Sequence, residues 1–154
     1  MGIKNHGQSK IETNNNLKSL TIMATKHLFL NDLHFNSKLW ANEISFFQQE
    51  IGLYEGFLSE VAQRWTDKTV MSELEHFQNQ FIIQREQSEI LAHDIKLFQK
   101  EIADYAKVND TAVNHKHFDA KAGELSSMDE RVEIYKSICN ELKTEFKNFL
   151  SKYL

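Results

Sequence analysis

Residues 70–105 read VMSELEHFQNQFIIQREQSEILAHDIKLFQKEIADY. Eleven positions here follow each other at alternating steps of four and three, nine of them are apolar, and the spacing never slips. A 3.5-residue repeat of this kind is typical of a helix that packs lengthwise against other helices. At 1.5 Å per residue the helix would be roughly 50 Å long, so it would span the whole domain. The repeat positions are Val70, Leu74, Phe77, Phe81, Gln84, Ser88, Leu91, Ile95, Phe98, Ile102 and Tyr105.

The same spacing occurs before and after this stretch. A first helix is expected from about residue 27 or 28 to Trp65, and a last helix from Met128 to about Tyr153. Ser127, followed three residues later by Glu130, matches a capping box that would begin the last helix. The first repeat comprises Leu30, Leu33, Ser37, Trp40, Ile44, Phe47, Ile51, Tyr54, Leu58, Val61 and Trp65, and the last one Met128, Val132, Tyr135, Cys139, Leu142, Phe146, Phe149 and Tyr153.

Residues 66–69, Thr-Asp-Lys-Thr, form the turn between the first two helices and offer side-chain oxygens as N-cap acceptors for the second. Because the turn is so short, the two helices should be antiparallel neighbours, with residues whose numbers sum to about 135 lying level.

A second apolar row lies beside the main repeat on two of the helices. The buried face is therefore expected to be wider than a two-stranded contact needs, so at least three helices should meet. We therefore predict an all-α fold, an antiparallel up-down bundle of three long helices. The second rows are Leu39, Phe46 and Leu53 on the first helix, and Ile83, Ile90 and Leu97 on the central one.

Two segments lack any sustained period. Residues 1–26 are polar and are expected to be a disordered tail, so that residues 27–154 form a single helical domain. Residues 106–126 connect the second and third helices, and a connection of that length has room for a short fourth helix.

Composition excludes several classes of function. The chain has 154 residues, no proline, five glycines and a net charge of −4. Without a basic stripe we expect no nucleic-acid partner. The sequence has no apolar run of about 18 residues, so we expect no membrane-spanning helix. The N-terminal region has no apolar segment, so we expect no secretory signal. The cytoplasm is therefore the default location. The single cysteine, Cys139, excludes an intrachain disulfide and zinc sites built on cysteine pairs.

Polar side chains also fall on the inward face, where burial is costly unless they are paired. One interpretation is a buried polar network that fixes register and partner choice. The other is a carboxylate metal site, which the glutamines disfavour because they are poor metal ligands. In the register above, Glu50 could meet Gln84 or Gln87, and Glu43 could meet Asp94 or Gln87. The network residues are Glu43, Glu50, Gln80, Gln84, Gln87 and Asp94.

A second metal hypothesis concerns histidines. His34 should lie level with Glu101, and the connection carries His115 and His117 toward the same end. Histidine nitrogens and one carboxylate suit a divalent transition metal such as Zn(II), Cu(II) or Fe(II). The E-x-x-H repeat of ferritin-type di-iron bundles is not met, since only His76 follows an acid at that spacing.

The leading functional hypothesis is a non-enzymatic bundle that binds itself or another helical protein through its helix faces. The alternative is a small metal-binding bundle for storage, sensing or redox use. An enzyme with Glu43 and Glu50 as acid and base is disfavoured, because neither a nucleophile constellation nor a glycine-rich phosphate loop accompanies them.

Overall fold

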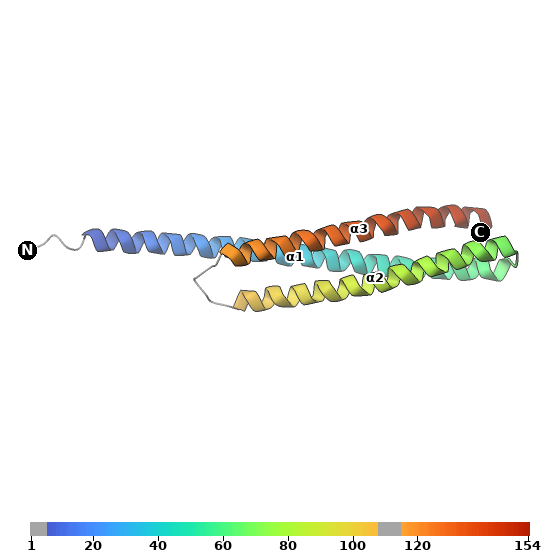
Figure 1. Cartoon of the computed structure of the whole chain (residues 1–154), viewed down its shortest axis with the longest axis horizontal. Coiled ribbons are helices and arrows are strands. Elements are labelled where there is room, and N and C mark those ends of the chain that lie inside the picture. Colours follow the sequence, from blue (N-terminus) through green and yellow to red (C-terminus); the bar gives the residue numbers. More distant parts are fainter. Residues whose placement is uncertain (1–5, 108–114) are drawn as a thin grey trace, which may run out of the picture.

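The computed structural model describes the backbone of residues 6–107 and 115–154, with side chains over 11–107 and 119–154. It contains three helices, α1 (His6–Arg64), α2 (Lys68–Lys107) and α3 (His115–Tyr153). These ranges contain no strand, so the prediction of an all-α chain with three helices is confirmed. Figure 1 shows the helices lying lengthwise along one another, with the N-terminal part of α1 extending beyond the other two.

Side-chain hydrogen bonds define how α1 runs relative to α2. The Gln48 amide donates to the Ser88 hydroxyl (3.0 Å), and the Gln99 amide donates to the carbonyl of Ser37 (3.2 Å). Residue numbers therefore rise along one helix and fall along the other, and in both pairs they sum to 136 (48 + 88 and 37 + 99). This confirms the register predicted from the short turn.

Two ion pairs define how α3 lies against α1. Lys136 pairs with Glu43 and Lys143 pairs with Glu50, and both pairs are separated by 93 residues in sequence. A constant separation means that α1 and α3 run in the same direction.

The main repeat of each helix forms the core. Every repeat position of residues 70–105 is buried except Tyr105, and every one in the last helix except Tyr153. The core divides into two apolar clusters, one on each side of the level of Gln84 and Ser88. The cluster nearer the α1–α2 turn is rich in aromatic rings, in which Phe81 and Phe146 pack edge to face at 5.0 Å.

The second apolar rows are not buried, so the prediction of a wide apolar face is wrong. On α1, Leu39, Phe46 and Leu53 are 44, 54 and 65% exposed. On α2 the corresponding row, Ile83, Ile90 and Leu97, is 45 to 51% exposed. The reason is that α2 and α3 cover only the main repeat of α1, and no fourth element lies over the second rows in the described chain. None of the described helices contains a stretch both long and apolar enough to cross a membrane.

Helix α1 begins much earlier than the sequence indicated. We expected residues 1–26 to be irregular, whereas the helix begins at His6. Extending an existing helix adds one hydrogen bond per residue without a new nucleation step, and no proline interrupts the segment. The Thr21 and Thr25 hydroxyls donate to carbonyls one turn back, at 2.9 Å each.

Helix α3 also begins earlier than predicted, at His115. Ser127 lies inside it, so the capping-box assignment is wrong. Residues 115–126 belong to α3 and not to a separate short helix, and Leu125 packs against the core from there. The apolar period is weak over these residues because the three-helix contact is only beginning. Residues 108–114 lie outside the described part of the chain.

The turn between α1 and α2 is capped as expected. The Asp67 carboxylate accepts hydrogen bonds from the backbone N–H groups of Thr69 (2.8 Å) and Val70 (3.3 Å), the first turn of α2. Trp65 fastens the same end to α3, because its indole N–H donates to the carbonyl of Tyr153 at 2.9 Å.

Candidate functional site

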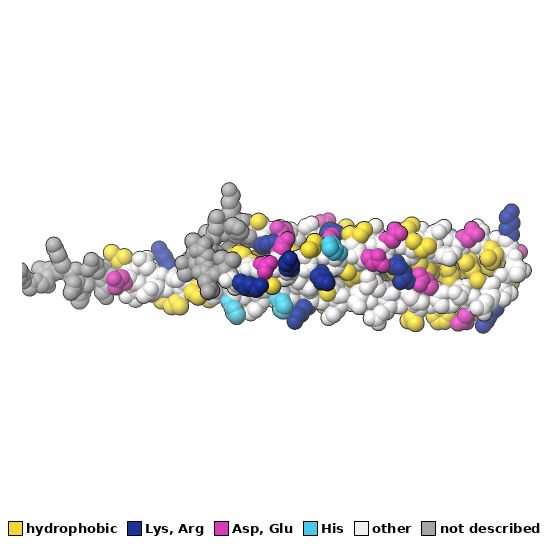
Figure 2. Space-filling view, turned by 90° about the horizontal axis from the view of Figure 1, so that it is seen from below, with side chains coloured by type: hydrophobic (Ala, Val, Ile, Leu, Met, Phe, Trp, Pro, Cys, Tyr) yellow, Lys and Arg dark blue, Asp and Glu magenta, His cyan; other side chains and the backbone are white. Residues whose placement is uncertain are grey.

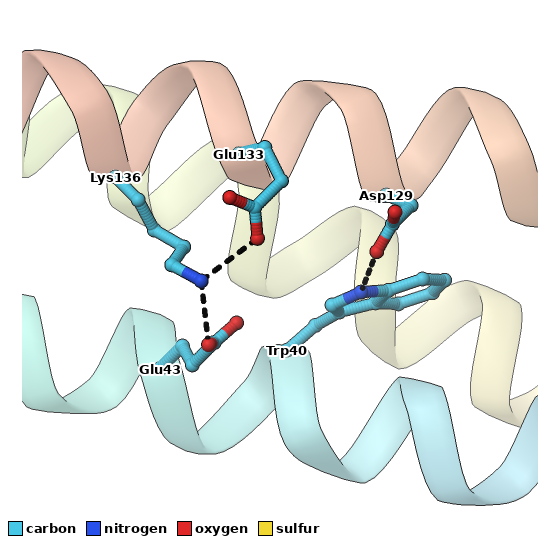
Figure 3. Close-up of polar contacts among 5 residues, drawn as sticks. All are labelled: Trp40, Glu43, Asp129, Glu133 and Lys136. Carbon is cyan, nitrogen blue, oxygen red and sulfur yellow. Dashed lines mark hydrogen bonds and ion pairs between the residues drawn. The ribbon is translucent and has the colours of Figure 1, made fainter.

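Two acids on α1, Glu43 and Glu50, face α3, where each pairs with a lysine. Lys136 donates to Glu43 at 2.8 Å and to Glu133 at 2.7 Å (Figure 3), and Lys143 donates to Glu50. Hydrogen bonds to Glu133 and Glu43 raise the pKa of Lys136. This flank of α1 therefore carries formal charges that are already neutralised.

Trp40, which lies about one turn before Glu43 on α1, also contacts α3. The indole N–H of Trp40 donates to the Asp129 carboxylate at 3.0 Å, one turn before Glu133 on α3 (Figure 3). The sequence reasoning missed Lys136 and Lys143 as partners because it set a register only between the first two helices. The signal that could have found them is the equal seven-residue spacing of the two glutamates and the two lysines.

A polar layer crosses the core at Gln84 and Ser88. Ser88 is fully buried, and its hydroxyl donates to the carbonyl of Arg85 at 2.6 Å while it accepts from Gln48. The Tyr135 hydroxyl donates to the backbone carbonyl of Gln84 at 3.1 Å. Burial raises the pKa of Tyr135 well above its ordinary value, so this phenol stays protonated at neutral pH.

The thiol of Cys139 lies in the same region of the core and is also unsuited to chemistry. It is buried and free, and burial is the main reason that its pKa is raised. A protonated, buried thiol is neither a good nucleophile nor a metal ligand. Cys139 belongs to the main repeat of the last helix, and it is buried with that repeat.

The six residues of the predicted polar network do not meet at one place. Glu43 and Glu50 pair with lysines of α3, and Asp94 pairs with Arg131 of α3 at 2.6 Å. Gln87 is exposed and Gln80 is half-buried. Only Gln84 enters the core, with 6% of its surface exposed. The expected contacts of Glu50 with Gln84 or Gln87, and of Glu43 with Asp94 or Gln87, are therefore wrong, because α3 supplies a cation to each acid.

The histidine site is not assembled by the residues whose side chains are described. His34 is exposed, and Glu101 forms an ion pair with Lys121 at 2.7 Å. His115 and His117 lie in the first turn of α3, and their side chains are outside the described part. Over 11–107 and 119–154, no group of three or more His, Cys, Asp or Glu side chains is placed to hold a metal ion.

Among the described side chains, the hydroxyl of Tyr54 is the buried polar atom that has no hydrogen-bond partner. It is enclosed beside the Glu50–Lys143 pair. Its pKa is raised, first by burial and then by the negative charge of Glu50. The tyrosine ring packs on Phe81 and Phe146, with centroids at 5.7 and 5.3 Å. Packing therefore fixes this side chain in place.

Large apolar side chains are exposed on each of the three helices. Figure 2 shows hydrophobic side chains reaching the surface in patches along the bundle, between charged ones. On α1 they align, because residues separated by four or seven positions lie on one side of a helix. We call this set the α1 row. It consists of Phe35 (66% exposed), Leu39 (44%), Phe46 (54%), Leu53 (65%) and Phe57 (42%).

Comparisons with known proteins add no assignment: no family model, no curated protein and no solved structure matches the chain.

Proposed function

We propose that the protein is a non-enzymatic up-and-down helical bundle whose outer helix faces bind a helical partner, which is either itself or another protein. The α1 row carries this proposal. Its five large apolar side chains are about half exposed along one face, and an exposed apolar patch of this kind is often functional in a soluble protein.

The chemistry of the described residues supports binding over catalysis. Glu43 and Glu50, the candidate acid and base, are held in ion pairs with lysines. An open depression of about 460 Å³ lies elsewhere, between α2 and α3, and these two acids do not line it. A helix face that presents aromatic and leucine side chains is suited to packing against another helix.

A photo-crosslinking experiment in cells tests this function. The full chain would carry a photoreactive phenylalanine analogue at Phe46 or Leu53, or, as a matched control, at the exposed Asn140 on α3. We expect covalent adducts to a protein from the two row positions and none from the control position. Equal adduct formation at all three positions, or none at the row positions, would remove the proposal.

A further inference from the structure

Between Phe35 and Phe57 the α1 row is symmetric about its central residue. Leu28 (69% exposed) continues the line seven residues before Phe35, where the symmetric counterpart is Arg64, so the symmetric part is confined to these five residues. Its members follow each other at steps of 4, 7, 7 and 4, and their identities read Phe, Leu, Phe, Leu, Phe. At about 100° per residue, all five lie within about 20° of one line along the helix. The row therefore reads the same in both chain directions, with Phe46 at its centre.

We infer that the partner of the α1 row is a second copy of this chain, packed antiparallel with its two-fold axis at Phe46. The inference rests on the proposed function and names its partner. A two-fold contact requires a surface that is complementary to itself. In this arrangement Phe46 meets Phe46 of the second copy, Leu39 lies level with its Leu53, and Phe35 lies level with its Phe57.

Charges along the row permit this contact. On the side away from α3 the row is bordered by Asn42 and Gln49, which carry no charge. On the α3 side it is bordered by Glu43 and Glu50, each of which already has a lysine partner. Two copies would thus approach without bringing unpaired like charges together along the centre of the contact.

The available area also fits a dimer. Five side chains that are about half exposed offer roughly 100 Å² each, or roughly 1,000 Å² from two copies. Since apolar atoms make up about 60% of such contacts, the whole interface would be roughly 1,700 Å², a standard size for a specific complex. The exposed row on α2, which we call the α2 row, consists of Ile83, Ile90 and Leu97. It is a weaker candidate because it has only these three aliphatic residues. One heptad further on either side, the same line continues with the polar residues His76 and Asp104.

Light scattering on the purified full chain tests the inference first. At about 50 μM, a concentration that populates a micromolar dimer, we expect twice the chain mass of 18.0 kDa. Phe46→Lys places two ammonium groups at the two-fold axis and should halve the observed mass. Ile83→Lys is the matched control, since it adds the same charge to the α2 row, and it should leave the mass unchanged. Both side chains are exposed, so circular dichroism should show unchanged folding in each variant.

Cysteine crosslinking tests the register. Phe46→Cys should form a disulfide dimer on mild oxidation, because only the residue on the axis meets itself. Phe35→Cys alone should not, whereas a mixture of Phe35→Cys and Phe57→Cys chains should crosslink to each other. The buried native thiol of Cys139 is present in all variants and serves as the common background.

The outcomes separate this inference from the proposed function. A monomeric wild-type chain overturns the inferred dimer. A wild-type dimer that Ile83→Lys disrupts and Phe46→Lys does not would place the contact outside the α1 row, which also overturns the inference. A dimer that crosslinks at other positions overturns the axis at Phe46. If the cellular adducts at Phe46 and Leu53 contain a different protein and the purified chain is monomeric, the binding function stands and the second-copy partner is excluded.

Discussion

Two buried tyrosine hydroxyl groups in the core differ in whether they form a hydrogen bond. Tyr135 donates to the carbonyl of Gln84, whereas the enclosed hydroxyl of Tyr54 makes no hydrogen bond. A net hydrogen bond stabilises a fold by about 1 kcal/mol, and burying an unpaired hydroxyl costs free energy. Chemically identical groups should therefore contribute to stability with opposite signs.

Removal of each hydroxyl tests this difference. Tyr135→Phe should lower the free energy of unfolding by about 1 kcal/mol, because it deletes a buried hydrogen bond. Tyr54→Phe should leave it unchanged or raise it slightly. Urea denaturation of both variants beside the wild type measures the two effects. A loss of equal size in both would show that the Tyr54 hydroxyl has a partner in solution.

Stability should also fall at alkaline pH. The pKa of Tyr135 is raised in the folded state by burial, and that of Lys136 by its hydrogen bonds to Glu133 and Glu43. The folded chain therefore holds protons that the unfolded chain releases at about pH 10 to 10.5, and stability decreases as pH rises through and above this range. The urea midpoint at about pH 8 and about pH 10.5 measures the change. Tyr135→Phe should reduce this fall in the urea midpoint between the two pH values. If the midpoint of the variant falls as much as that of the wild type, other groups cause the loss of stability.

At the scale of the helix, the sequence predicted the burial of the main repeats well, and the second apolar rows and the element limits poorly. The four-three spacing of Phe77, Phe81 and their neighbours specifies which side of a helix is apolar, and that side is buried. The same periodicity predicted the row of Phe46 to be buried as well. Periodicity shows only that residues share a face, and whether another helix covers that face depends on how many helices the chain supplies.

The candidate site shows the same limit. Glu43 and Glu50 were correctly placed beside the core, yet their partners were sought on the second helix. Choosing α3 required the register of α1 against α3, which are separated in the sequence by the whole of α2. The equal seven-residue spacing of the two acids and of Lys136 and Lys143 was the available signal, and the register of the short turn did not use it. The exposure of the α1 row could not be predicted, because periodicity does not show which faces another helix covers.

Deletion of the first 22 residues tests how α1 depends on tertiary packing. No described residue before Leu33 is buried, so the segment contributes helical length and little packing. A chain that begins at Met23 should lose far-ultraviolet ellipticity in proportion to the helical residues removed, while its thermal midpoint changes little. A large fall in the midpoint would mean that the segment packs against the rest of the molecule in solution.

At the scale of the whole molecule, Gln84 and Ser88 divide one long core into two clusters. A polar core residue lowers stability, and in helix bundles it often restricts the alternative registers that a uniform apolar seam would permit. The aromatic cluster near the turn is held by a short loop and the Trp65–Tyr153 contact. The polar layer lies at the boundary between the two clusters, so a register device there would align both halves.

Replacing Gln84 with leucine joins the two clusters and tests this role. The Tyr135 hydrogen bond goes to the backbone carbonyl of residue 84, so it is retained in the variant. Gln84→Leu should raise the free energy of unfolding by about 1 kcal/mol, and the thermal midpoint of a chain this size by about 3 °C. Gln87→Leu is the matched control, because the same change at that exposed position should have little effect.

If Gln84 holds the register, the more stable variant should also show broader amide resonances or additional oligomers, since a continuous apolar seam permits helices to shift by a heptad. A destabilised variant with a single sharp state would instead assign Gln84 an essential hydrogen bond of its own.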